Sequence, residues 1–225
     1  MLALQLEAAA EASSIQDLFE RLSAKGQFLR VDQTIAPTMY RGPTLSEDEV
    51  ELLRRITGVV RLGKVRRIER GSIVLEHGTI PTSADALHVH CATVGLNPAP
   101  EVPIFSDEQI VLQSIRIGLI PFNAALIGYV EATREDTVEK NRLCPPNRQP
   151  NTPADWARGL MVSMGADRLW SKQPDISEWL DRARLNPTRG LRQRAHEPQV
   201  RSNLARYAQL ARPALSNLAS LVSHG

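Results

Sequence analysis

The chain has 225 residues, of which 42% are hydrophobic, and it carries a formal net charge of +2. A chain of this length and apolar content can bury a substantial core, which excludes a disordered segment and predicts one large domain or two small ones. The near-neutral charge excludes a general attraction of the whole protein to nucleic acid or to an anionic membrane.

We expect no targeting signal and no membrane span. The amino terminus carries two glutamates and lacks a basic flank, so it is a poor secretion signal. The most apolar run, residues 117–130, is interrupted by a proline and is shorter than the roughly 20 residues that cross a bilayer. The two cysteines, Cys91 and Cys144, lack a C-x-x-C spacing, which favours a reducing cytoplasm over a disulfide scaffold or a zinc site.

The chain up to Gly58 is predicted to be helical. Apolar residues recur at helical spacing over 15–22, directly after a Ser14 cap. A second helix is predicted after Ser46, which forms a capping-box pattern with Glu49 three residues later. Gly58 is expected to end that helix.

From Val59 the hydrophobic period approaches two, which predicts short strands. Arg70-Gly71 and His77-Gly78 are expected to form the turns, since glycine adopts a positive φ without a steric penalty. We predict strands at residues 59–68, 72–76, 86–91 and 109–115.

Helical periodicity returns beyond Gly118. A proline-rich linker at 144–153 interrupts it and is the expected hinge or flexible loop. We predict helices at residues 123–142, 154–170, 175–185 and 200–222.

These elements predict the α/β class, or α+β for the chain taken alone. A meander that ends in a glycine turn is typical of a segment that closes a cofactor-binding sheet. None of the 13 glycines, however, falls into the G-x-G-x-x-G spacing that brings a backbone close to a pyrophosphate. We therefore expect an incomplete dinucleotide-binding sheet, organised as a helical entry segment at 1–58, a strand meander at 59–116 and a mostly helical region at 117–225.

The segment from Gly58 to Lys64 has the spacing of a phosphate-binding P-loop. A P-loop follows a strand, opens a helix and has serine or threonine after its lysine, whereas this segment follows a predicted helix and has Val65 there. We interpret it as a helix end followed by a strand.

Three further groups have alternative interpretations. His88 and His90 would face one side of a strand, as paired metal ligands do, but no third ligand is evident nearby, which favours ordinary polar residues. Ser163 lacks the glycine pattern of a nucleophile elbow. Cys144 has no evident base, so an incidental thiol is favoured over a reactive one.

The last forty residues are rich in arginine, which would allow helices there to bind phosphates. The alternative is a solvated helix face with leucines packed on the other side, which we favour because the chain is near neutral and shows no nucleic-acid-binding pattern. The arginines are Arg182, Arg184, Arg189, Arg192, Arg194, Arg201, Arg206 and Arg212.

The segment from Leu87 to Leu96, LHVHCATVGL, resembles a bacterial family of NAD(P)/FAD-dependent oxidoreductases. Other blocks match in order, LRRITGVVRLGKVRRIERGSIVLEHGTIPT upstream and VPIFSDEQIVLQSIR, ALIGYVEA and EKNRLCPP downstream. The similarity runs from about Leu6 to about Leu185 and covers the carboxy-terminal half of the family. Members tend to have an acidic residue where this chain has His90.

The resemblance implies a flavoprotein that transfers hydride between NAD(P)H and FAD and whose glycine-rich amino-terminal domain must come from elsewhere. It places Ala92, Thr93, Gly95 and Leu96 beside the cofactor and identifies no catalytic acid or base. From charge and hydropathy we expect no membrane partner and no nucleic-acid partner. The alternative function is a non-enzymatic binding or assembly module that uses the arginine-rich carboxy-terminal helices.

Overall fold

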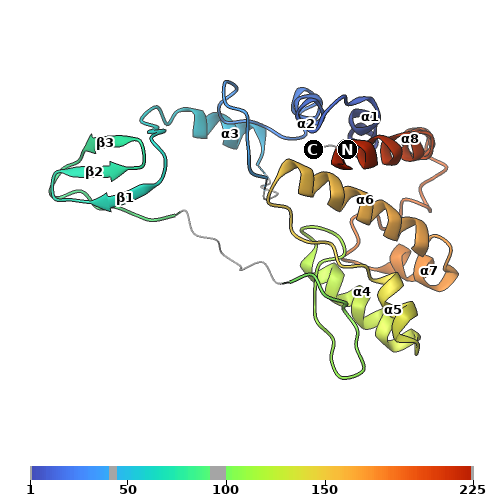
Figure 1. Cartoon of the computed structure of the whole chain (residues 1–225). Helices are drawn as coiled ribbons and strands as arrows, with labels where there is room; N and C mark the ends of the chain where they lie inside the picture. The colour runs from blue at the N-terminus through green and yellow to red at the C-terminus, as the bar shows by residue number, and fades with distance from the viewer. Residues whose placement is uncertain (1, 41–44, 92–99, 224–225) are drawn as a thin grey trace. The chain divides into compact units, whose positions relative to one another are not determined.

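The computed structural model describes residues 2–40, 45–91 and 100–223. Within these ranges the chain forms eight helices and one three-stranded sheet (Figure 1), which confirms a mixed class with an incomplete sheet. The helices are α1 (Leu2–Glu11), α2 (Ile15–Ala24), α3 (Glu47–Arg54), α4 (Ile120–Thr133), α5 (Thr137–Leu143), α6 (Pro153–Trp170), α7 (Pro174–Arg182) and α8 (Pro198–Ser223). The strands are β1 (Val65–Ile68), β2 (Ser72–Leu75) and β3 (Gly78–Pro81).

The chain divides into two compact units. A helical unit joins residues 1–46 to residues 98–225, and a sheet unit comprises residues 47–97. The predicted segments 1–58, 59–116 and 117–225 follow the order of element types, whereas the units group parts that are distant in sequence.

In the helical unit, α1 lies beside α8, although about 200 residues separate them (Figure 1). Leu6, Ala8 and Ala9 of α1 are fully buried, and the small alanines let the two helices approach closely. The Asn217 side-chain amide donates to the carbonyls of Ala9 and Ala12 at 2.9 and 2.7 Å. It thereby satisfies acceptors at the end of α1 that the helix itself leaves unpaired.

Helix α6 contributes to both hydrophobic cores of the helical unit. Trp156, near its start, packs with the rings of Phe19, Phe28 and Tyr40, whose centroids lie 5.5, 5.2 and 6.3 Å away. Trp170, at its end, is fully buried in the second core, and its indole donates to the Leu143 carbonyl at 2.7 Å.

The loop that precedes α4 meets α6 at Gly159, where a side chain has no room. A Cβ on Gly159 would lie 2.5 Å from Cδ1 of Ile117 and 3.0 Å from Oδ1 of Asn147. The buried Asn147 amide group donates to the carbonyls of Ile115 and Gly159 at 3.0 and 2.9 Å. This contact joins the loop, the proline-rich segment and α6.

In the sheet unit, β1, β2 and β3 pair antiparallel in chain order. The two-residue connection Glu76-His77 joins β2 to β3, one position earlier than the predicted His77-Gly78 turn. Strand β1 begins at Val65, not at Val59, because residues 55–64 are irregular.

Two predicted strands are wrong. The third strand of the meander is Gly78–Pro81, and residues 86–91 are irregular. Residues 109–115 form no strand either; only Ile110 pairs with Phe105 in an isolated bridge. In both places the apolar alternation is present but the neighbouring strand is not, and strands exist only as pairs.

The helix predictions were more accurate. Helix α2 begins after Ser14, whose hydroxyl accepts from the Asp17 amide, and α6, α7 and α8 lie where the sequence placed them. Helix α3 ends at Arg54, before the predicted Gly58. The single helix predicted at 123–142 is two, because Asp136 caps a new helix and ends the continuous pattern.

We expect Gly159→Ala to destabilise the protein by about 1–3 kcal/mol, since the added methyl group overpacks the contact with Ile117 and Asn147. Gly165, on the same helix, is the matched control because a Cβ there meets nothing within 4 Å. Gly165→Ala should stabilise by about 0.5–1 kcal/mol through helix propensity. Equal shifts in urea denaturation for both variants would contradict the close contact.

A second prediction concerns pH. The carboxylate of Glu7 on α1 is hydrogen-bonded by Lys25 and Arg206, which lower its pKa below the ordinary value. A lowered pKa contributes stability above the ordinary carboxyl pKa, and this is lost as pH falls through the lowered value.

Glu7→Gln should therefore reduce the melting temperature at neutral pH and leave it unchanged in strong acid. Glu20→Gln is the control, since that carboxylate accepts from the neutral amide of Gln16 at 2.9 Å. A Glu7→Gln deficit that persists in acid would show that packing, not charge, is responsible.

Candidate functional site

The residues predicted to lie beside the cofactor, Ala92, Thr93, Gly95 and Leu96, are outside the described residues. Cys91, directly before them, is exposed. The described chain resumes at Pro100, and the candidate site that follows is built from the residues after it.

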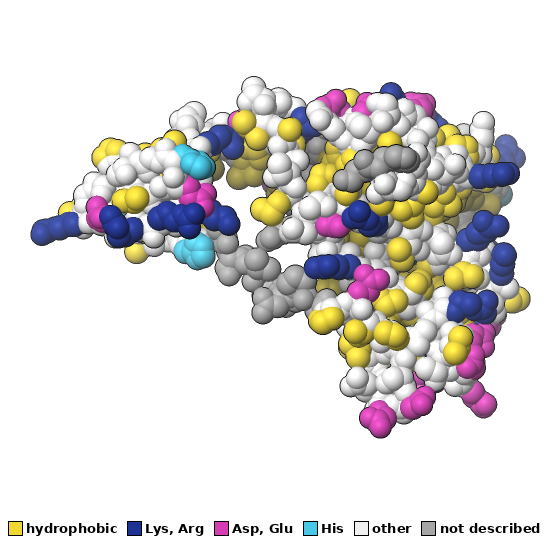
Figure 2. Space-filling model, viewed as in Figure 1, with side chains coloured by type: hydrophobic (Ala, Val, Ile, Leu, Met, Phe, Trp, Pro, Cys, Tyr) yellow, Lys and Arg dark blue, Asp and Glu magenta, His cyan; other side chains and the backbone are white. Residues whose placement is uncertain are grey.

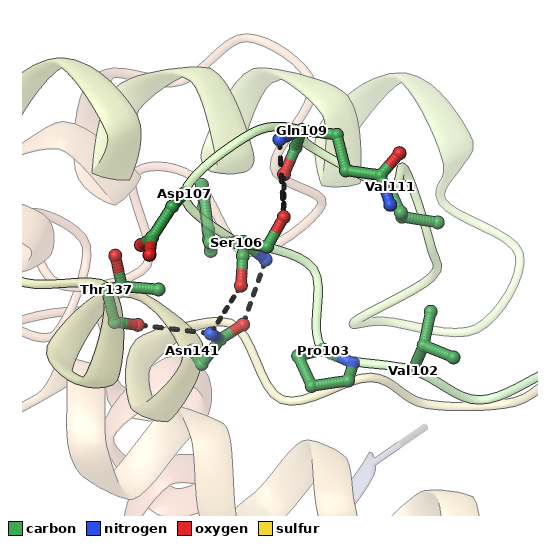
Figure 3. A pocket seen from close by; sticks show the side chains of 9 residues that line it. Val102, Pro103, Ser106, Asp107, Gln109, Val111, Thr137 and Asn141 are labelled. Atoms are coloured by element: carbon green, nitrogen blue, oxygen red, sulfur yellow. Dashed lines mark hydrogen bonds between the residues drawn. The ribbon is translucent and has the colours of Figure 1, made fainter.

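A pocket of about 450 Å³ lies in the helical unit, six residues beyond Leu96 in sequence (Figure 3). A tight turn between Phe105 and Ile110 forms one wall, and α5 forms another. Its volume is within the range of small-molecule sites. The lining residues are Val102, Pro103, Phe105, Ser106, Asp107, Gln109, Val111, Thr137 and Asn141.

Asn141 holds the turn against α5. Its side-chain oxygen accepts from the Phe105 amide at 3.0 Å, and its side-chain nitrogen donates to the Phe105 carbonyl at 2.8 Å. The same nitrogen donates to the Thr137 carbonyl at 3.1 Å. The side chain of Asn141 thus satisfies both the amide and the carbonyl of Phe105, as a neighbouring strand would. These hydrogen bonds explain how the turn keeps a fixed shape outside a sheet.

The turn itself is closed by Ser106. Its amide donates to the Gln109 carbonyl at 3.0 Å, and its hydroxyl accepts from the Gln109 amide at 3.2 Å. The polar groups left to face the pocket include the Asp107 carboxylate and the Thr137 hydroxyl (Figure 3).

This arrangement does not suit a diphosphate. None of the nine lining residues is basic, one is acidic, and the amides of Phe105, Ser106 and Gln109 are already hydrogen-bonded. Phosphate sites need free backbone amides or cationic side chains. The lining combines apolar side chains with five polar ones, of which only Asp107 is charged.

Arg116 is a partly buried cation that the sequence analysis missed. Its side chain is 13% exposed, pairs with Asp167 and donates to Asn186 at 2.9 Å. The guanidinium carbon lies 5.0 Å from the ring centroids of Phe122 and Trp170. Its partners lie up to 70 residues away in sequence, so no local motif could indicate the cluster.

Ser163 and Cys144 hold structural positions. Ser163 is inside α6, as expected for a residue outside a nucleophile elbow, and its hydroxyl accepts from Asn147 at 3.0 Å. Cys144 is fully buried, and burial raises the pKa of its thiol to about 12. A protonated thiol is a poor nucleophile, and this agrees with the interpretation of Cys144 as an incidental thiol.

The histidine pair is not arranged as the sequence predicted. Because residues 86–91 are irregular, the argument that His88 and His90 share one strand face fails. A ring nitrogen of His88 lies 3.1 Å from the Thr82 hydroxyl. Across residues 2–40, 45–91 and 100–223, no three His, Cys, Asp or Glu side chains are grouped so as to hold a metal ion.

The segment from Gly58 to Lys64 opens no helix, which confirms that it is not a P-loop. Instead, the Lys64 amide donates to the carboxylate of Glu76 at 3.0 Å. This hydrogen bond is the main cause that lowers the pKa of Glu76. Gly63 has a φ of +82°, and a Cβ there would clash with the Glu76 carboxylate. The segment therefore binds a carboxylate of the protein itself.

Half of the eight carboxy-terminal arginines form ion pairs with the protein's own carboxylates. Arg182 pairs with Glu178 and Arg192 with Asp181. Arg194 pairs with Glu197 at 2.8 Å. Arg206 pairs with Glu7. On α8, Leu218 is buried, and Tyr207, Leu210, Leu215 and Leu221 pack against the first core, as the solvated-face interpretation predicts.

No protein-family model matches the chain, and no solved structure matches it. Uncharacterized proteins of Mycobacterium tuberculosis and Mycobacterium bovis are 40% identical to it over 200 residues. The match covers 88% of this chain and 37% of each relative. The chain therefore spans well under half the length of these relatives.

No helix among the described residues combines the length and apolar character needed to cross a bilayer.

The two cysteines should differ in reactivity. In the folded protein a chromogenic thiol reagent should react rapidly with exposed Cys91 and should reach buried Cys144 only in denaturant. Cys91→Ser should abolish the rapid reaction. Rapid labelling of the folded Cys91→Ser variant would contradict the burial of Cys144.

Proposed function

We propose that this chain is the carboxy-terminal portion of an oxidoreductase that transfers hydride between NAD(P)H and FAD. In this proposal the glycine-rich dinucleotide-binding domain belongs to a separate polypeptide or to a longer form of the protein. Both cysteines are free in the structure, which suits a cytoplasmic location.

The observation that carries the proposal is the position of the meander. The strands β1, β2 and β3 end at Pro81, ten residues before the Ala92-Thr93 segment that resembles the flavoprotein return to the cofactor. The meander thus precedes this segment in chain order, as the resemblance implies, although residues 86–91 between them form no strand.

The length of the relatives agrees with a missing domain. The chain matches 37% of each mycobacterial protein, so the remainder has room for a dinucleotide-binding domain. Within the present sequence no glycines have the G-x-G-x-x-G spacing. The pocket beside Asn141 has no cation to replace a glycine loop.

The bound FAD would supply the redox chemistry, and the chain would position it and exclude water. The resemblance places Thr93, Gly95 and Leu96 closest to the cofactor. Small residues there let a backbone approach a flat ring system.

The second candidate is a non-enzymatic binding module built on the carboxy-terminal arginines. Arg184, Arg189, Arg201 and Arg212 are all exposed, which favours it. Retention of the chain on nucleic acid that weakens steeply with salt would support this module over the oxidoreductase.

The test of the oxidoreductase is co-expression of this chain with the rest of the Mycobacterium tuberculosis relative. We expect the purified complex to be yellow and to lose its visible flavin absorbance on anaerobic addition of NADPH or NADH. A colourless complex that neither nucleotide alters would contradict the proposal.

Paired variants make the test specific. Gly95→Val should lower the flavin content of the complex, because the resemblance places Gly95 against the cofactor. Gly71→Val is the control, since Gly71 is exposed and a Cβ there meets nothing within 4 Å. Equal flavin content in the two variants would remove Gly95 from the site.

A further inference from the structure

The segment Ala86–Cys91 has the sequence of a strand but not the structure of one. Leu87 and Val89 alternate with His88 and His90, which is the period of an extended chain with one apolar face. Both apolar side chains are exposed, Leu87 by 89% and Val89 by 72%. Figure 2 shows hydrophobic side chains at the surface of the sheet unit, on the left.

Within the described part of the chain, the backbone beyond Ala86 is also unpaired. The Ala86 amide donates to the Ser83 carbonyl at 3.2 Å and closes a turn. For residues 87–91, no backbone hydrogen bond to another described residue is found. A segment with unpaired amides and two exposed apolar side chains meets both requirements of strand addition, which joins main-chain hydrogen bonds to side-chain burial.

The edges of the chain's own sheet are poor partners for this segment. Strand β1 carries a bulge between Val65 and Arg67, together with two arginines, and both features discourage pairing. Strand β3 is four residues long and ends in Pro81, which has no amide proton to donate. A sheet outside this chain is therefore the better template.

We infer that Ala86–Cys91 is an interaction strand that adds to the edge of a sheet in the part of the longer protein that this chain lacks. We choose this partner because of the length of the relatives, of which this chain matches only 37%. The identification of that sheet as a dinucleotide-binding one rests on the proposed function, whereas the pairing of the strand does not.

The test uses the full chain and the rest of the Mycobacterium tuberculosis relative, purified separately and mixed. Wild-type chain should form a complex in sedimentation velocity, and amide exchange at residues 87–91 should slow on binding. Val89→Pro removes an amide proton and fixes φ, so it should weaken the complex by about tenfold or more. Val89→Thr keeps the amide and a β-branched side chain and should bind nearly as wild type does.

Because residue 89 is exposed and irregular in the chain alone, both variants should melt at the wild-type temperature. Absence of a wild-type complex, equal binding by the two variants, or a melting temperature lowered by Val89→Pro alone would each overturn the inference. Self-association that Val89→Pro abolishes would overturn it in favour of a second copy. A complex that depends on Val89 but is colourless would support the strand and contradict the flavin proposal.

Discussion

The approach of Ile117 and Asn147 to Gly159 organises the helical unit. At this point the loop that follows the pocket turn packs against α6 so closely that even one methyl group on Gly159 would clash with Ile117 and Asn147. The side-chain amide of Asn147 donates a hydrogen bond to the carbonyl of Ile115, and the Ile115 side chain is fully buried in the second core. Arg116, between Ile115 and Ile117 in this loop, joins it to α4, because its main-chain amide donates to the Asn123 side chain at 2.9 Å.

The two units differ in how completely they bury their apolar residues. The helical unit contains two cores that share α6, and its interior polar groups, such as Asn147 and Asn123, are hydrogen-bonded. In the sheet unit, by contrast, Val65 and Ile68 of β1 are about half exposed, at 55% and 50%. A two- or three-stranded sheet of this kind gains its stability from covering a hydrophobic face, and β1 leaves these side chains half exposed.

Several side chains that could carry chemistry make contacts within the protein instead. Arg116 forms an ion pair with Asp167, and its guanidinium lies close to two aromatic rings. The thiol of Cys144 is buried, and the hydroxyl of Ser163 accepts a hydrogen bond from Asn147. The carboxylate of Glu76 accepts a hydrogen bond from the Lys64 amide, in the segment whose spacing resembled a P-loop.

The sequence by itself determined where α2, α6, α7 and α8 lie, since a cap such as Ser14 and a 3.6-residue period act within one segment. It also determined that Gly58–Lys64 opens no helix and that Ser163 lies within one. Only the tertiary structure decided which apolar runs became strands. Residues 78–81 found a partner and residues 86–91 did not, because a strand is stabilised by a neighbour whose position no local pattern records. The Asn141 and Arg116 clusters were decided in the same way, by contacts between residues 36 to 70 positions apart.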